Sequence, residues 1–445
     1  PVTANNTSIP QSLPGTTTMK KVAHLVRDLA TKTRGKVLVV GSYTAEQRQR
    51  SSYHAILQAA QSSGIPCVPF SPLIREEEED STPGCLIDHA VDGFAMARRT
   101  GCASVLVVGG GCTIEVAKSI ATLLPSTINP QLLMEPSTRD KLISDVTGGT
   151  AVGTAAAAPM IAVPTTFHGC VAASSNRTYL SDPLEGAVMD MSSDHLDRAG
   201  GIHVVIEPSI LRQSSPLTCA EGAISSLARL SDAVLINEGG ADDIGKDGGR
   251  ALGELLGSVK DLLNIFFDLH DRGQPSMASW TKLLEEEEDI CEQYGAIGCV
   301  IGSCISLGGP GITQSIARVV TSNYNVSFGQ ACALVLPHVI KIQLERSSTY
   351  DASSMSARGA EVHRENVSFD GNQQGSNIYS AFGRIRNRVV IPTPSDDDLK
   401  ELTSAVMMDN CFQNAVEEDN GKEDWTRATI ANLLKATFAY LQEEE

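Results

Sequence analysis

Five short runs rich in β-branched residues alternate with helix-like segments over the first 208 residues, and this alternation constrains the fold most strongly. The runs are "KVLVVGS" (36–42), "IPCVPFS" (65–71), "SVLVVGGG" (104–111), "PMIAVPTT" (159–166) and "HVVIEP" (203–208). Segments 51–64, 88–101 and 113–124, which lie between them, carry apolar residues at helical spacing. Strands that alternate with helices predict a parallel, doubly wound sheet.

The pattern changes near residue 208, after which the β signal fades and apolar residues recur at helical spacing. We therefore predict an α/β plus all-α protein, with a doubly wound parallel-sheet domain over 1–207 and a helical domain over 208–445. Two stretches fit neither pattern. Segment 125–157 is predicted to be an insertion, and the polar, Ser/Asn/Gly-rich segment 346–380 is predicted to be a mobile surface loop.

Charge and cysteine usage narrow the function classes. The chain has 445 residues and a net charge of −18, which argues against nucleic-acid binding and against attraction to an anionic membrane. We expect no membrane span, because no apolar run reaches about 18 residues. The first residues lack the basic-then-apolar pattern of a signal peptide. Eleven cysteines without a CxxC pair fit reduced thiols, so we expect a cytoplasmic protein.

The first chemical signal is "VLVVGGGCTIEVAK", in which a predicted strand ends at three glycines and a helix follows. Glycines let a phosphate approach the backbone, and a helix N-terminus offers free N–H groups and the positive end of a dipole. Gly109–Gly111 are therefore a candidate pyrophosphate site, although a plain tight turn stays open as the alternative. Lys118 lies about one turn further along and could reach a phosphate or a substrate.

Three segments together resemble the iron-containing alcohol dehydrogenases, a superfamily that includes glycerol dehydrogenase and dehydroquinate synthase. They are "GGGCTIEVAKSIA", "IAVPTTFHG" and "FGQACALVLPHVI". The variant most similar to them is maleylacetate reductase, through Thr113, the Pro164–Gly169 loop and the "LPHV" segment. The resemblance implies a dinucleotide-binding domain, a helical domain and an active site in the cleft between them.

The chain departs from this family at the positions of the metal ligands. The resemblance places these ligands at Gly222 and Ser226, at Gln314 and Arg318, and at Phe328. None of these residues is a good ligand for Zn²⁺ or Fe²⁺, and an arginine places a permanent positive charge near the position of the cation. We therefore expect no metal. A guanidinium could instead polarise a carbonyl group or hold a carboxylate.

The loop that starts at Pro164 gives the catalytic candidates. His168 replaces a small residue of the maleylacetate reductase pattern and is a natural general acid or base. A purely structural histidine is the competing interpretation. Arg318 is expected to face His168 across the cleft, and Tyr324 could donate a proton or only pack. Cys170 could be reactive or an inert buried thiol.

The same resemblance assigns two further sets of residues. The expected cofactor contacts are Ser42, Gly109, Gly110, Gly111, Cys112, Thr165 and Thr166. The expected substrate pocket contains Phe167, Cys170, Gly222, Ser226, Gln314 and Phe328. NAD and NADP both stay open, because the strand that ends at Gly41 and Ser42 has no following carboxylate, whereas Arg48 and Arg50 are near.

Three functions stay open on these grounds. The first is a metal-independent NAD(P)H-dependent reductase of a carbonyl or enone. The second is a redox-neutral enzyme on the same scaffold, such as a cyclase, dehydratase or aldolase-type catalyst, and the third is a non-catalytic relative. The expected partners are a small-molecule substrate, anionic or carbonyl-bearing, and a second copy of the chain in a homodimer.

Overall fold

The structure is a computed structural model. The described residues are 16–41, 52–71, 87–135, 138–139, 157–182, 187–190, 202–211, 214, 216–236, 259, 288–306, 311–324, 326–347, 385, 391, 394–418 and 425–439.

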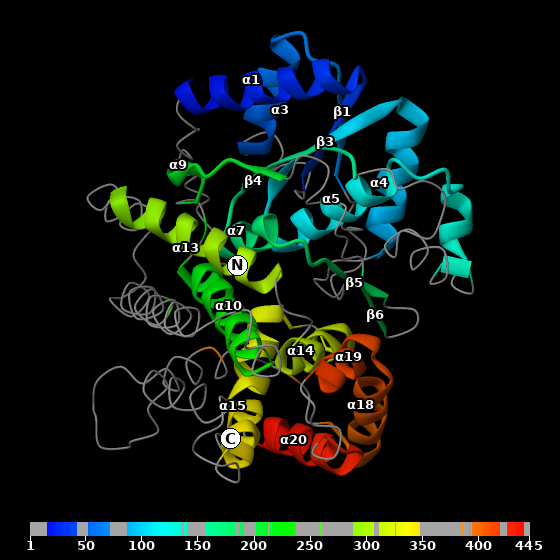
Figure 1. The fold of residues 1–445 in the computed structure, drawn as a ribbon, viewed down its shortest axis with the longest axis vertical. Helices are drawn as coiled ribbons and strands as arrows, with labels where there is room; N and C mark the ends of the chain where they lie inside the picture. Colours follow the sequence, from blue (N-terminus) through cyan, green and yellow to red (C-terminus); the bar gives the residue numbers. More distant parts are fainter. Residues whose placement is uncertain are drawn as a thin grey trace, which may run out of the picture.

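A five-stranded parallel sheet forms the upper part of the molecule (Figure 1). Its strands are β1 (Lys36–Gly41), β2 (Cys67–Phe70), β3 (Cys102–Gly109), β4 (Met160–Pro164) and β7 (Ile202–Val204). They are arranged in the order β2-β1-β3-β4-β7, and every neighbouring pair is parallel. The five strands predicted from the sequence are thereby confirmed, and so is the doubly wound class. Since the strand order reverses between β1 and β3, a crevice for a ligand is expected at the carboxyl ends of these two strands.

Helices cover both faces of this sheet and bury alternate residues of each strand. They are α1 (Thr16–Thr33) and α3 (Ser52–Ser62) on one face, and α4 (Ile87–Thr100) and α5 (Gly111–Leu123) on the other. Val37 and Val39 of β1 pack with the first pair of helices, whereas Leu38 and Val40 pack with the second. Because both faces are buried, each strand is a nearly continuous apolar run, as is typical of parallel sheets.

After residue 207 the chain is helical in the residues that the structure describes. The helices are α9 (Pro208–Leu211), α10 (Pro216–Ile236), α13 (Glu288–Ser306), α14 (Ile312–Asn323), α15 (Phe328–Ser347), α18 (Asp396–Met408), α19 (Asn410–Glu418) and α20 (Arg427–Ala439). They share one apolar core. Helices α10, α14, α15, α18, α19 and α20 lie below the sheet in Figure 1. The predicted helical half of the fold is confirmed, whereas the proposed boundary between residues 207 and 208 stays a prediction.

The structure corrects the sequence interpretation between residues 163 and 190. The stretch after Pro164 was expected to be a loop, but residues Phe167–Ser174 form a helix, α7. The hydroxyl of Thr166 accepts a hydrogen bond from the Gly169 N–H and so caps its first turn. A hairpin of β5 (Tyr179–Asp182) and β6 (Ala187–Asp190) follows, which the sequence pattern did not indicate.

Several predictions fall outside the described residues. They concern Ser42, Arg48 and Arg50, most of the insertion 125–157, and residues 348–380 of the proposed loop. The described part of the insertion includes a short 3₁₀ helix, η1 (Pro130–Met134). Among the helices that the structure describes, none combines the length and the apolar character needed to cross a membrane.

Candidate active site

The glycine loop joins β3 to α5 at the carboxyl edge of the sheet. Gly110 is the N-cap of α5, and no side chain caps this end of the helix. A Cβ atom on Gly109 would lie 2.6 Å from the Thr113 side chain, and one on Gly111 would lie 1.9 Å from the His168 ring, so both positions require glycine. A Cβ atom on Gly110 would meet only Thr166, at 3.4 Å. Gly110 is therefore the glycine with room for a ligand beside it.

The end of β4 lies directly beside this loop. The Thr165 N–H donates to the Gly109 carbonyl at 2.9 Å, and Thr165 and Thr166 are both partly exposed. Cys112, in the first turn of α5, is exposed. These features fit a pyrophosphate. A phosphate group can approach the backbone closely beside Gly110 and the threonines, and the free N–H groups at the start of α5 provide a positive electrostatic potential. The residues present therefore fit a dinucleotide at this edge.

His168 lies in the first turn of α7 and packs on Gly111. Its Nδ1 atom is 2.9 Å from the Ser225 hydroxyl, and that hydroxyl donates to the Gly222 carbonyl at 2.8 Å. Since a hydroxyl has one proton, Ser225 accepts from the Nδ1–H group. The Nε2 atom then carries the lone pair. A Cβ atom on Gly111 would lie 2.7 Å from Nε2, so this acceptor is adjacent to the glycine loop.

A buried ion cluster links the α/β part of the chain to the helical part. Glu115 of α5 is 1% exposed, and its Oε1 atom lies 3.2 Å from an Nη2 atom of Arg229 on α10. The same oxygen lies 3.9 Å from Nη2 of Arg318 on α14. Because three helices meet at one carboxylate, the cluster fixes the position of both guanidinium groups.

Aromatic rings hold Arg318 in place. Its guanidinium carbon lies 4.2 Å from the centre of the Tyr179 ring and 5.0 Å from that of Phe328. Phe328 also contacts Arg229, at 5.5 Å, and its ring centre is 5.9 Å from that of His168. Cation–π contacts of this kind orient a guanidinium in a site that excludes water. Phe328 is therefore the common neighbour of His168 and both arginines.

The charges of the cluster change the ionisation of its members. Burial alone would raise the pKa of Glu115, but Arg318 and Arg229 outweigh it and lower that pKa to about 2. Burial, and then Arg229, lowers the pKa of His168 to about 3, against the opposing effect of Glu115. We therefore expect a permanently ionised Glu115 and a neutral His168 in the ligand-free protein.

The structure brings together some of the predicted residues. His168, Arg318 and Phe328 form one contiguous group, with Gly222 packed against the backbone of His168. His168 and Arg318 both lie against the Phe328 ring, and their expected placement across one cleft stays a prediction. Their roles, and those of the predicted cofactor contacts, stay predictions.

Five other candidates have partners that do not point to catalysis. Tyr324 ends α14, and its ring packs on Phe438 of α20 at 5.3 Å, a contact that favours the packing role over the proton-donor role. The Ser226 hydroxyl donates to the Gly222 carbonyl at 2.8 Å. The backbone N–H of Gln314 donates to the buried carboxyl group of Asp232. Cys170 and Phe167 are buried in the apolar core.

Lys118 does not reach toward the phosphate site considered for it from the sequence. It is fully buried, and its ammonium group donates to the carbonyl groups of Ala172 at 3.0 Å and Arg177 at 2.6 Å. These contacts direct the ammonium group toward the end of α7 and the chain that follows it, away from the glycine loop.

Sequence reasoning missed Arg229, Ser225 and the partner role of Glu115. A signal for Arg229 was available, because it follows Gly222 by seven residues and Ser226 by three, which places all three on one helical face. Nothing in the sequence indicated that Ser225 would bind the histidine ring.

The residues at the expected metal positions do not fit a dication. The positions implied by the family resemblance hold Gly222, Ser226, Gln314 and Phe328, while two guanidinium groups occupy the neighbourhood. Within the described residues, no group of three or more histidine, cysteine or acidic side chains is arranged to hold a metal ion. A cation placed beside Arg229 and Arg318 would be repelled by both.

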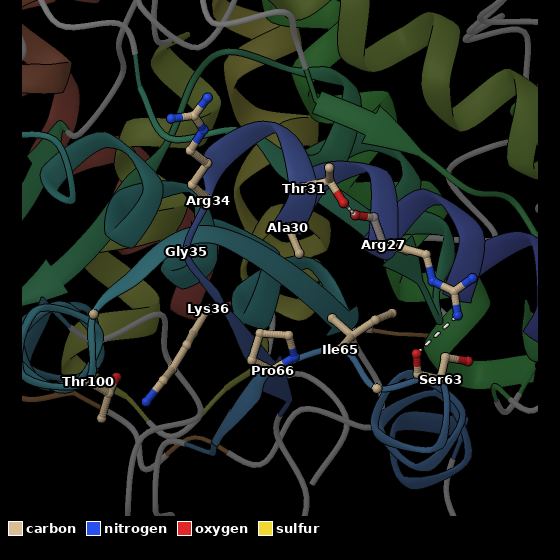
Figure 2. Close-up of a pocket in the computed structure, with 12 residues that line it drawn as sticks. Arg27, Ala30, Thr31, Arg34, Gly35, Lys36, Ser63, Ile65, Pro66 and Thr100 are labelled. Atoms are coloured by element: carbon tan, nitrogen blue, oxygen red, sulfur yellow. Dashed lines mark hydrogen bonds between the residues drawn. The ribbon is translucent and has the colours of Figure 1, made fainter.

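A separate open cleft of about 740 Å³ lies at the opposite, amino edge of the sheet, between α1 and the starts of β1 and β3. Figure 2 shows that its basic side chains do not converge, since Arg34 and Lys36 point to different sides. Arg27 donates to the Ser63 carbonyl at 3.0 Å. This cleft therefore lacks the convergent polar groups of a binding site, and the candidate site is the one around His168.

Comparison with known proteins agrees with the family resemblance. Residues 11–196 match the family model described as iron-containing alcohol dehydrogenase. A comparison with curated protein sequences gave no match.

Solved structures similar to the whole chain include an iron-containing alcohol dehydrogenase (TM-score 0.64, 14% identity, covering 94% of this chain and 95% of the other). An iron-containing alcohol dehydrogenase from Thermotoga maritima gives a TM-score of 0.63 at 13% identity over 94% and 96% of the two chains. The NADH-dependent butanol dehydrogenase A of the same organism gives 0.61 at 14% identity over 96% and 97%.

These matches confirm the resemblance to the iron-containing alcohol dehydrogenase superfamily. The family model covers the sheet region up to β6, and the similar structures extend the shared fold over nearly the whole chain. At such low identity the structures show the fold alone, and the closer resemblance to maleylacetate reductase stays a prediction.

Proposed function

We propose that this chain is an NAD(P)-dependent oxidoreductase that reduces a carbonyl or enone group without a metal ion. The dehydrogenase type is supported by the family match of residues 11–196 and by the whole-chain fold. The metal-free character rests on one observation, the buried cluster of Glu115, Arg229 and Arg318, which provides fixed positive charge at the expected metal position.

The two arginines differ in what they can do. Arg229 is 1% exposed and bound to Glu115 at 3.2 Å, so it is mainly a fixed electrostatic element. Arg318 is 8% exposed and lies further from that carboxylate, at 3.9 Å. We assign Arg318 to the substrate oxygen, where a preorganised donor stabilises the negative charge that develops in the transition state.

His168 is assigned to the proton of the same oxygen. When bound, the nicotinamide supplies a hydride for reduction or accepts one in the reverse direction. In the oxidation direction, the neutral Nε2 atom of His168 accepts the hydroxyl proton, and the Nδ1–H bond to Ser225 keeps this tautomer in place. In the reduction direction the imidazolium returns the proton, because negative charge on the oxygen opposes the effect of the arginines and raises the pKa of His168.

The charge balance favours an anionic or strongly polarised substrate. Lys118, Arg229 and Arg318 are all buried around Glu115, and the Nε atom of Arg229 has no hydrogen-bond partner among the described residues. Asp232, a second buried carboxyl group, caps the start of α14, and burial raises its pKa to about 7. An incoming anion would offset part of this buried positive charge.

Dinucleotide binding gives the first test. We expect wild-type protein to bind NADH or NADPH, and Gly110→Val to abolish binding, because the branched side chain would fill the space beside Thr166 that the pyrophosphate needs. Calorimetric titration with both dinucleotides measures this.

The matched control for this variant is Gly64→Val, a change in a turn of positive φ outside the site. It should lower stability and leave the dissociation constant unchanged. Absence of dinucleotide binding by the wild-type protein would remove the oxidoreductase proposal and favour redox-neutral chemistry.

Metal content gives the second test. We expect less than about 0.1 zinc or iron per chain in tag-free protein, since each ligand position holds a poor donor or a cation. Elemental analysis by mass spectrometry measures this, with a chelator-treated sample as the control. About one metal per chain, lost together with activity on chelation, would contradict the metal-free mechanism.

A further inference from the structure

Two cysteines meet where α7 packs on α13. Cys170 and Cys299 are 129 residues apart in the sequence, and the Cys299 thiol donates to the Cys170 carbonyl at 3.9 Å. Each thiol also shifts the pKa of the other. The two cysteines are therefore neighbours at the contact between α7 and α13.

Glycines in α13 produce this close contact. A Cβ atom on Gly298 would lie 2.8 Å from the Cβ atom of Cys170, and one on Gly302 would lie 2.3 Å from the Val171 carbonyl oxygen. The absence of side chains at these positions lets the two helix backbones approach closely. The contact is thus fixed by rigid helix packing, as a short covalent link between the helices requires.

The two thiols differ in access and in ionisation. Cys299 is half-buried, whereas Cys170 is fully buried. The hydrogen bond from Cys170 lowers the pKa of Cys299 to about 7, against the effect of burial, while the same contact and burial raise the pKa of Cys170. A reachable thiolate beside a buried thiol is the usual arrangement of an attacking and a resolving cysteine.

We propose that Cys170 and Cys299 form an oxidative modification site, at which a hydroperoxide converts the two thiols to a disulfide. The Cys299 thiolate attacks one peroxide oxygen of hydrogen peroxide, the O–O bond breaks, and one water leaves with a proton from solvent. The sulfur of Cys170 then attacks the resulting sulfenic acid, the S–S bond forms, and a second water leaves. The thiols lose two electrons in total, and the peroxide gains them.

The link would also act on the candidate site, because α7 carries His168 two residues before Cys170. Tyr294 of α13 already accepts a hydrogen bond from the Phe167 N–H at 3.0 Å. A disulfide would add a covalent tie between the same two helices, so the oxidised protein should melt at a higher temperature than the reduced one. This expectation does not depend on the proposed oxidoreductase activity.

The test is peptide mapping of the full-length protein after treatment with a few equivalents of hydrogen peroxide and alkylation of free thiols. We expect one cross-linked peptide pair that contains Cys170 and Cys299, and its loss on reduction with dithiothreitol. Cys299→Ser and Cys170→Ser should each abolish the pair. Reaction at the exposed Cys112 falls on a separate peptide and is counted separately.

Cys67 of β2 and Cys102 of β3, which β1 separates in the sheet, provide the control. Cys67 is also half-buried, but burial and then Cys102 raise its pKa to about 11, so this pair should stay reduced. Cys67→Ser should leave the cross-link unchanged. The proposal is overturned if wild-type Cys170 and Cys299 both remain alkylatable, or if Cys299 is oxidised to sulfinic acid without forming the link.

Discussion

His168→Ala should lower kcat by about 10²–10⁴, the usual cost of losing one general acid–base group. The reason is geometric. The Nε2 acceptor of His168 adjoins the glycine loop, and the His168 ring and the Arg318 guanidinium group both contact the ring of Phe328. Steady-state kinetics with the substrate of the enzyme, in both reaction directions, would measure the loss. Binding of the dinucleotide should change much less, since Thr165, Thr166 and the glycines remain.

Two variants separate catalysis from structure in this experiment. His203→Ala removes an exposed histidine of β7 and should keep wild-type turnover. Ser225→Ala leaves the imidazole in place but removes the partner of Nδ1, so it should give an intermediate loss of kcat through the wrong tautomer. Near wild-type turnover of His168→Ala would show that the histidine is structural.

The sheet could be predicted in detail because each parallel strand is buried on both faces. Runs such as "SVLVVGGG" are then apolar along their whole length and end at the glycines that start the next helix. The helix α7 could not be predicted in the same way. Its sequence "FHGCVAAS" has no amphipathic pattern, because the helix lies between the two cores and is buried on nearly all sides.

The site could be predicted only in part, because its contacts depend on how helices pack in space. His168, Arg318 and Phe328 were found because the family resemblance gives their positions. The pairing of Glu115 with Arg229 depends on how α5 and α10 approach each other in space, which no spacing along the chain encodes. Tyr324 shows the reverse case, since a position close to Arg318 in sequence proved to face α20.

Glu115→Gln should destabilise the protein by about 3–5 kcal/mol, because it leaves two buried guanidinium groups without their carboxylate. The folded-state pKa of Glu115 is lowered to about 2, so its stabilising effect is fully present above the ordinary glutamate pKa and is lost as pH falls toward 2. The difference in unfolding free energy between wild type and variant should therefore be largest near pH 7 and should become smaller at acidic pH. Urea denaturation at several pH values measures it.

The control for burial is the exposed ion pair of Lys400 and Asp397, whose side chains are 73% and 87% exposed. Asp397→Asn should leave stability nearly unchanged, because solvent screens this pair. The double variant Glu115→Gln, Arg229→Met should lose less unfolding free energy than the sum of the losses of its two single variants. The reason is that it removes one unpaired buried guanidinium group together with the carboxylate. If the destabilising effects of the two changes are strictly additive, the carboxylate and the guanidinium group do not interact. That result would contradict the role of the cluster in the proposed mechanism.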